Sequence, residues 1–244
     1  MRAVSLARQL ALPYLDYKGP SQGLQPEFLL SQTTRRLELR ETHRGYPRPL
    51  YVDFVGGPLG FRRHFGQNRR QPIAKAIGRH GHPTIVVDAT AGLAQDSFLL
   101  ACLGFTVISI ERSAVLSALV WDGLSRARGH SPQLDEVLSR FAPVMDDARK
   151  VLEAMKGAKA PDVVYLDPMY PPRKKDAASK KEMRICRRLV GDDPDAGDLF
   201  EVAVGCAKKR VVVKRALHAP PLGPKPDTTH RGTRVRYDVY LIRN

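Results

Sequence analysis

The stretch that decides the fold is "TIVVDATAGLAQDSFLLACLGFTVISIE", residues 84–111. It begins with a β-branched run typical of a buried strand and continues through a turn of small residues into an apolar, helix-like segment. Gly104 predicts the end of that helix, because glycine readily adopts the left-handed conformation that closes helices. A second strand-like run, "FTVISIE", follows directly. The stretch therefore predicts a strand, a helix and a second, parallel strand, the unit from which α/β sheets are built.

The same alternation of strands and helices continues toward the C-terminus. Ser113 is the expected N-cap of the next helix, since its hydroxyl can accept a hydrogen bond from the first helical turn. The expected elements are a helix over 113–129, a strand over 142–146, a helix over 147–157, a strand over 162–168, a helix over 195–209, a strand over 210–215 and a strand or hairpin over 233–243. This order predicts a doubly wound, mostly parallel, Rossmann-like α/β sheet that binds its ligands beyond the carboxyl ends of its strands.

The chain divides into two regions by pattern. Residues 1–70 contain the strand-like runs "RRLELR" and "LYVDFVGG", separated by the turn "HRGYPRP", and are predicted to form a small α+β appendage. Residues 71–244 are predicted to form the main domain. A length of 244 residues suits one medium domain with such an appendage.

The charge balance points to a polyanionic partner. The chain has 40 Lys and Arg against 25 Asp and Glu, a formal net charge of +15 and a pI near 10.0. Nucleic acid is the first partner to consider and a membrane surface the second. No apolar run reaches the roughly 18 residues that cross a bilayer, so we expect a cytoplasmic protein with no membrane partner. Its oligomeric state is left open.

The cysteines are expected to be bystanders. Cys102, Cys186 and Cys206 are widely spaced in helix-like contexts, which fits free thiols in a reducing compartment better than a disulfide or zinc framework. We therefore expect no metal site.

The turn "DATAGLAQD", residues 88–96, is a candidate cofactor site. Asp88 ends the first strand and Glu111 the second, 23 residues later, where an acid can accept both ribose hydroxyls of a nucleoside. Dehydrogenases share this pattern, but a dinucleotide site usually needs G-x-G-x-x-G, and here only Gly92 is a glycine. Asp88 and Asp96 would repel a pyrophosphate and suit a zwitterion that carries an amino group and a sulfonium. The predicted cofactor is S-adenosyl-L-methionine.

A third acidic position follows the strand over 142–146. Asp146 or Asp147 could hydrogen-bond an adenine amino group. Capping of the following helix by one of the two is an equally good interpretation, and it is compatible with binding by the other.

The segment "VVYLDPMYPP", residues 163–172, carries the predicted reacting end. Asp167, Pro168, Met169 and Tyr170 resemble the Asp/Asn-Pro-x-aromatic motif of methyltransferases that modify exocyclic amino groups of nucleobases. Such an amine is a poor nucleophile until acceptors hold its N–H groups; the Asp167 carboxylate and the Pro168 carbonyl can do so. Tyr170 can stack on the base. The alternative interpretation is an ordinary Asp-Pro turn at the end of a strand, with no catalytic role. Cytosine C5 chemistry is disfavoured, because no cysteine stands at a strand end.

Basic residues cluster near the predicted strand ends. Each cluster could be a solvated surface, but together they favour RNA phosphates as ligands. The candidate RNA-binding residues are Arg62, Arg63, Arg69, Arg70, Lys174, Lys175, Lys181, Lys214 and Arg215.

Taken in order, the segments "VDFVGG", "RRHFGQNR", "AKAIG", "VDATAGLAQD", "VVYLDPMYP", "KKEMR", "LVG", "VVVKR" and "APPL" resemble the ribosomal RNA small subunit methyltransferase J family over roughly residues 35–243. The resemblance implies a class I methyltransferase that modifies the exocyclic N2 of one guanosine near the 3′ end of 16S rRNA, with the small ribosomal subunit as partner. Carried onto this sequence, the family's cofactor contacts fall on Gln95, Asp96, Glu111, Arg112, Asp146, Asp147 and Asp167.

The chain departs from the family pattern at two places. Ala94 and Gln95 stand where the family turn has a glycine and an arginine, and the Asp146–Asp147 pair replaces small hydroxyl residues. Two other functions stay open: an adenine-N6 methyltransferase acting on nucleic acid, and a non-catalytic RNA-binding factor of ribosome assembly.

Overall fold

The main sheet places the candidate site. The computed structural model describes residues 2–15, 26–42, 48–56, 60, 71–78, 84–169 and 181–243 of the 244. Seven strands of this part form one sheet in the order β5-β4-β3-β6-β7-β9-β8. They are β3 (Ile85–Asp88), β4 (Thr106–Ile110), β5 (Phe141–Val144), β6 (Val163–Leu166), β7 (Arg210–Ala216), β8 (Thr228–Arg231) and β9 (Val235–Leu241).

The sheet is doubly wound around one switch point. β5, β4, β3, β6 and β7 are mutually parallel, and β9 pairs antiparallel with both β7 and β8. From β3 the chain first moves outward to β4 and β5, then returns to the other side of β3 for β6 and β7. The carboxyl ends of β3 and β6 therefore flank the crevice where such sheets bind ligands. The predicted class I, mostly parallel α/β sheet is confirmed.

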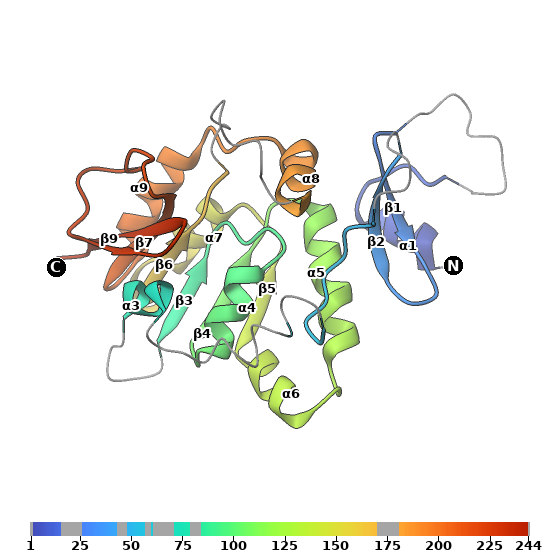
Figure 1. The fold of residues 1–244 in the computed structure, drawn as a ribbon, viewed down its shortest axis with the longest axis horizontal. Helices are drawn as coiled ribbons and strands as arrows, with labels where there is room; N and C mark the ends of the chain where they lie inside the picture. Colours follow the sequence, from blue (N-terminus) through green and yellow to red (C-terminus); the bar gives the residue numbers. More distant parts are fainter. Residues whose placement is uncertain are drawn as a thin grey trace.

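Two apolar layers cover the sheet, because successive side chains of a buried strand point to opposite faces. Val86 and Tyr165 pack into one core cluster with α4 and α5, whereas Val87 and Val164 pack into the other with α7 and α9. Figure 1 shows α4 crossing the first face. The helices are α1 (Arg2–Gln9), α3 (Pro72–Ile77), α4 (Gln95–Cys102), α5 (Ala114–Ala127), α6 (Pro132–Ser139), α7 (Ala148–Met155), α8 (Lys181–Val190) and α9 (Ala196–Cys206), with a single 3-10 turn at Gly157–Lys159.

The predicted end of the α4 segment at Gly104 and the predicted N-cap of α5 at Ser113 are both confirmed. Gly104 has φ +94, the left-handed conformation that ends the α4 segment, and the Ser113 hydroxyl accepts a hydrogen bond from the backbone N–H of Leu116. Four helices of the described residues were not predicted: α1, α3, α6 and α8.

The N-terminal region contains one small sheet. β1 (Phe28–Gln32) pairs antiparallel with β2 (Leu37–Glu41), and Figure 1 shows this pair beyond α5, at the opposite end of the molecule from the C-terminus. Arg188 of α8 reaches it, forming ion pairs with Glu27 and Glu41. The strand predicted at 35–40 is thus confirmed as β2, while β1 was missed.

The strand predicted at "LYVDFVGG" is wrong. Leu50 forms an isolated bridge with Leu39, and residues 51–56 pair with no strand of the described structure. Leu50, Val52 and Phe54 are instead buried in the main core, where the Phe54 ring lies 4.8 Å from the ring of Phe98. The alternating pattern therefore reports an extended segment with one buried face. The domain boundary near residue 70 lies outside the described residues and stays a prediction, although the core includes side chains from before it.

Candidate active site

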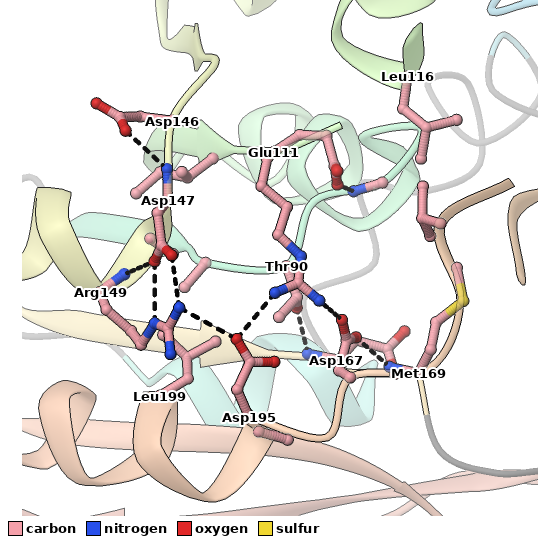
Figure 2. A pocket seen from close by; sticks show the side chains of 18 residues that line it. Thr90, Glu111, Leu116, Asp146, Asp147, Arg149, Asp167, Met169, Asp195 and Leu199 are labelled. Carbon is pink, nitrogen blue, oxygen red and sulfur yellow. Dashed lines mark hydrogen bonds and ion pairs between the residues drawn. The ribbon is translucent and has the colours of Figure 1, made fainter. Parts of the chain in front are cut away.

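A pocket opens at the carboxyl ends of the parallel strands (Figure 2). Its lining comes from the segments that follow β3, β4, β5 and β6 and from the segment that leads into α9. The lining residues are Ala89, Thr90, Gly92, Ile110, Glu111, Arg112, Leu116, Asp146, Asp147, Ala148, Arg149, Asp167, Met169, Val190, Asp193, Asp195, Ala196 and Leu199. Of the predicted site residues, Gly92, Glu111, Arg112, Asp146, Asp147 and Asp167 are thus brought together.

Glu111 ties the turn after β3 to the end of β4. Its carboxylate accepts hydrogen bonds from the backbone N–H groups of Gly92, at 2.8 Å, and Ser113, at 2.7 Å. Burial raises the pKa of Glu111, and these two N–H donors oppose the effect. A carboxylate has about four acceptor positions, so the two bonds leave capacity for the hydroxyls of a ribose.

The turn itself uses left-handed backbone at two positions. Gly92 and Ala94 both have φ +56, a conformation that glycine adopts freely and that costs other L-residues about 1–2 kcal/mol. Ala94 is therefore a strained residue at a position suited to glycine. Gln95, the second departure of the turn, donates from its side-chain amide to Glu182 of α8 at 3.0 Å and does not line the pocket.

Asp88 does not line the pocket, contrary to the sequence-based prediction. It is 2% exposed, and its carboxylate accepts from the Ser97 hydroxyl at 2.5 Å and from the Thr90 backbone N–H at 3.2 Å. Burial raises the pKa of Asp88 to about 7. Asp88 thus links the end of β3 to α4 through Ser97.

A network of ion pairs crosses the pocket. Arg112 pairs with Asp193 and, at 2.8 Å, with Asp195, which also lies 3.3 Å from the Arg149 guanidinium. Arg149 pairs in turn with Asp147 at 2.6 Å, and Figure 2 shows these dashed links from Asp147 through Arg149 to Asp195. The segment before α9 is thereby joined to the ends of β4 and β5.

The two aspartates after β5 have different hydrogen-bond partners. Asp147 is the N-cap of α7 and accepts from the Arg149 backbone N–H, and the hydrogen bond from the Arg149 side chain lowers the pKa of Asp147 to about 2. Asp146 accepts from the Asp147 backbone N–H, and in Figure 2 its carboxylate points away from Asp167. The helix-capping interpretation therefore holds for Asp147.

Asp167 stands at the end of β6, where its backbone and side chain have separate partners. Its N–H donates to the Thr90 hydroxyl at 2.6 Å, which joins the ends of β3 and β6 (Figure 2). One residue beyond the buried Pro168, the Met169 N–H donates to Asp193 at 2.7 Å, and the Asp193 N–H donates back to the Met169 carbonyl. The Asp-Pro segment is thus fixed on both sides.

Lys214 and Arg215 are not exposed cations, so their prediction as RNA-binding residues is not supported. The Lys214 ammonium lies between Asp96, at 2.7 Å, and Asp167, at 2.8 Å. Arg215 is 5% exposed and donates to the Pro220 carbonyl. Asp96 lies outside the pocket lining and also accepts from the Tyr165 hydroxyl at 2.7 Å.

The remaining predicted residues cannot be placed. Lys181 is the first residue of α8, and its side chain lies outside the described part of the structure. The other residues that lie outside it are Arg62, Arg63, Arg69, Arg70, Tyr170, Lys174 and Lys175.

Comparisons with known proteins connect this geometry to a family. A family model described as "Putative SAM-dependent methyltransferase" matches residues 20–242. A ribosomal RNA small subunit methyltransferase J of Coxiella burnetii is 47% identical over 244 residues, covering 99% of this chain and 92% of the relative. One of Nitrosococcus oceani is 45% identical over 241 residues, covering 98% and 93%. The chain belongs to the ribosomal RNA small subunit methyltransferase J family.

A solved structure agrees with that membership. The crystal structure of a SAM-dependent methyltransferase from Neisseria gonorrhoeae matches with a TM-score of 0.73 at 32% identity, covering 100% of this chain and 92% of the other. The family resemblance read from the sequence motifs is confirmed, as is S-adenosyl-L-methionine as the family's cofactor.

Four polar or charged residues of this family member's pocket were not predicted from its sequence: Thr90, Arg149, Asp193 and Asp195. One signal was available for the last two. The segment "GDDPDAGD", residues 191–198, is an acidic run in a chain of net charge +15. Its partner Arg112 lies some 80 residues earlier, so only the fold shows that the two meet.

Each of the three cysteines lies in a helix. Cys102, Cys186 and Cys206 form no disulfide and lie in α4, α8 and α9. Burial and then the nearby Glu111 carboxylate raise the pKa of the Cys186 thiol. Within the described ranges, no group of three or more His, Cys, Asp or Glu side chains is arranged to hold a metal ion. No helix of those ranges is long and apolar enough to cross a membrane.

Proposed function

We propose that this protein transfers a methyl group from S-adenosyl-L-methionine to the exocyclic N2 of a guanosine in 16S rRNA of the small ribosomal subunit. Membership of the family supports the reaction class and the ribosomal substrate. The observation that carries the choice of an exocyclic amine is the position of Asp167, which begins an Asp-Pro segment and lines the same pocket as Glu111.

The pocket suits the proposed cofactor by charge. Six carboxylates line it, those of Glu111, Asp146, Asp147, Asp167, Asp193 and Asp195, against two guanidinium groups, Arg112 and Arg149. In a chain of net charge +15, this local excess of negative charge favours a ligand with an ammonium and a sulfonium and disfavours a pyrophosphate. A nicotinamide dehydrogenase is thus the poorer interpretation.

Each pocket residue has a distinct proposed part in holding the cofactor. Glu111 accepts the ribose hydroxyls. Gly92 gives the ligand access to the backbone of the turn, since a side chain there would occupy that space. Asp146 is the better candidate for the adenine amino group, because Arg149 holds the Asp147 carboxylate at 2.6 Å, whereas the exposed Lys150 lies 3.3 Å from the Asp146 carboxylate. Arg112, with its acidic partners Asp193 and Asp195, borders the same pocket.

Asp167 and Pro168 are proposed to prepare the amine. The Asp167 carboxylate and the Pro168 carbonyl accept the two N–H groups, so that the nitrogen lone pair is directed away from the ring. The cofactor supplies a methyl group whose carbon–sulfur bond breaks as the nitrogen–carbon bond forms, with that electron pair staying on sulfur. Asp167 then accepts or relays the proton that leaves nitrogen, and Tyr170 stacks on a base that is flipped out or unpaired.

The RNA is expected to bind through a basic surface. The net charge of +15 supports strong, salt-dependent phosphate binding. Arg62, Arg63, Arg69, Arg70, Lys174, Lys175 and Lys181 stay proposed contacts, and such a substrate implies action in the cytoplasm.

The deciding experiment uses small subunits that lack the modification. They are incubated with the protein and methyl-labelled S-adenosyl-L-methionine, and the labelled nucleoside is identified by mass spectrometry and mapped. The expected product is N2-methylguanosine at one site. Label on adenine N6 would support the rival methyltransferase, and RNA binding without label would support a non-catalytic assembly factor; either result overturns the proposal.

A variant pair tests the part played by Asp167. Asp167→Ala is expected to abolish transfer while cooperative unfolding is retained. Asp227→Ala is the matched control, because Asp227 bonds Leu241 beside the start of β7, at the opposite end of the strands from the pocket. Normal turnover by Asp167→Ala would refute the mechanism.

A further inference from the structure

We propose that Lys214 is a positioning residue for methyl transfer, which fixes the Asp167 carboxylate in its acceptor orientation with Asp96 as the second anchor. The inference rests on the proposed function, because it needs Asp167 to hold the substrate amine. It assigns Lys214 to the reacting end of the site instead of to RNA phosphates.

The geometry is a three-member bridge between separate elements. Lys214 comes from β7, Asp96 from the first turn of α4, and Asp167 from the end of β6. The ammonium lies 2.7 Å from Oδ2 of Asp96 and 2.8 Å from Oδ2 of Asp167. The Tyr165 hydroxyl donates to the same Asp96 oxygen at 2.7 Å, so Asp96 is itself held in place.

Burial makes this bridge more than a surface ion pair. The side chains of Lys214 and Asp96 are 21% and 17% exposed, whereas that of Asp167 is 39% exposed. The cation is thus enclosed on the side of Asp96, and Asp167 is the member that reaches the pocket. Exposed ion pairs contribute little, but a partly enclosed lysine with two carboxylate partners has few alternative orientations.

The bridge also bears on the charge of Asp167, whose pKa is raised overall. Burial raises the pKa of Asp167, Lys214 lowers it, and the neighbouring carboxylates of Asp96 and Asp193 raise it again. Burial lowers the pKa of Lys214, but the Asp167 and Asp96 carboxylates outweigh burial and raise it above its ordinary value. Lys214 therefore stays protonated and favours an ionised Asp167, the form that accepts two hydrogen bonds.

Other charged groups surround this position and bear on any pH dependence. Besides Lys214 and Asp96, the titratable or charged groups near Asp167 are Asp88 of β3, Tyr165 of β6, Arg215 of β7, and Asp193 before α9 with its ion-pair partner Arg112.

The first test replaces Lys214 by methionine, which keeps the length of the side chain and removes the cation. Single-turnover methyl transfer to unmodified small subunits is measured from pH 5.5 to 9, with Lys209→Met as the matched control because Lys209 is exposed just before β7. At pH 6 the Lys214→Met rate is expected to fall about 100-fold, and the deficit to shrink as the pH rises and Asp167 ionises without its partner. Cofactor affinity by calorimetry should change by less than about 3-fold.

The second test is designed to lower the pKa of Asp167 instead of raising it, and it keeps Lys214. Asp96→Asn removes a like charge from the neighbourhood of Asp167 and keeps an oxygen for the Tyr165 hydroxyl, so the acid limb of the rate profile should move to lower pH. In Lys214→Met/Asp96→Asn, part of the lost rate at pH 6 should return. If urea unfolding shows that Lys214→Met does not fold, the single variant Asp96→Asn still tests the proposal.

The outcomes separate this inference from the proposed function. If the wild-type protein does not methylate small subunits, the proposed function fails. If it does, and Lys214→Met loses activity equally at all pH values together with cofactor binding, Lys214 is merely structural and the inference is overturned. Wild-type rates in Lys214→Met, or an acid limb that Asp96→Asn leaves unmoved, overturn it as well.

Discussion

Replacing Asp88 by asparagine should make the protein more stable than the wild type at pH 8 and should remove a pH dependence that the wild type shows between about pH 4 and 7. Asp88 is 2% exposed, and burial raises its pKa from 3.8 to about 7, against the hydrogen bonds from Ser97 and Thr90 that favour the ionised form. The folded state therefore binds a proton at Asp88 that the unfolded state releases near pH 3.8.

The magnitude follows from the two pKa values. One pKa unit corresponds to 1.36 kcal/mol, so the ionisation of Asp88 lowers the free energy of unfolding by about 4 kcal/mol once both states are deprotonated. The stability that the proton provides is complete below pH 3.8 and is lost as the pH rises to about 7. Since domains are stable by about 5–15 kcal/mol, the loss is a large fraction of the total.

The assay is urea unfolding of the wild type and of Asp88→Asn at pH 4, 5, 6, 7 and 8. The difference between the two free energies cancels every group that the proteins share. It should change in favour of the variant by about 1.4 kcal/mol per pH unit between pH 4 and 7 and then level off. A difference that is constant across this range, or one that moves in favour of the wild type as the pH rises, would refute the assignment of a buried, proton-binding Asp88.

Two further variants test the turn and the core. Glu111→Ala should lower cofactor affinity at least about 10-fold, because hydrogen bonds to a charged acceptor contribute about 1.5–3 kcal/mol and the Gly92 and Ser113 N–H groups lose theirs as well; unchanged binding in calorimetry would remove the ribose role. Phe54→Ala should lower the free energy of unfolding by about 3–5 kcal/mol, because the ring is 0% exposed and packs on Phe98 and Phe141; a loss below about 1 kcal/mol in urea unfolding would show that residues 50–56 are not part of the main core.

The fold was predictable where short-range patterns decide it. The β-branched runs at β3, β4, β6 and β7 are largely buried, and such runs are typical of parallel sheets covered on both faces. The run "LYVDFV" misled because its alternation of buried and partly buried residues is real, while pairing depends on a partner strand that lies elsewhere in the chain. α8 was missed because its charged residues hide a narrow apolar stripe that includes the buried Ile185 and Cys186.

The site was predictable at strand ends and much less so across loops. Glu111 and Asp167 could be placed because each ends a strand of a parallel sheet, and such ends meet at one edge. Asp88 also ends a strand of this sheet, but its side chain is buried and accepts a hydrogen bond from the Ser97 hydroxyl. Lys214 looked like part of a basic surface, because one-dimensional charge clusters do not show that Asp96 and Asp167 face it.

The burial of Phe54 has a consequence for synthesis of the chain. Its ring partner Phe141 lies 87 residues later, in β5, at one edge of the sheet. At about 5–20 residues per second, translation produces that partner roughly 4–17 seconds after Phe54 itself. Throughout this interval the apolar side chains of residues 50–56 have no completed core to enter. The nascent N-terminal segment is thus the part of the protein for which a ribosome-associated chaperone would matter most.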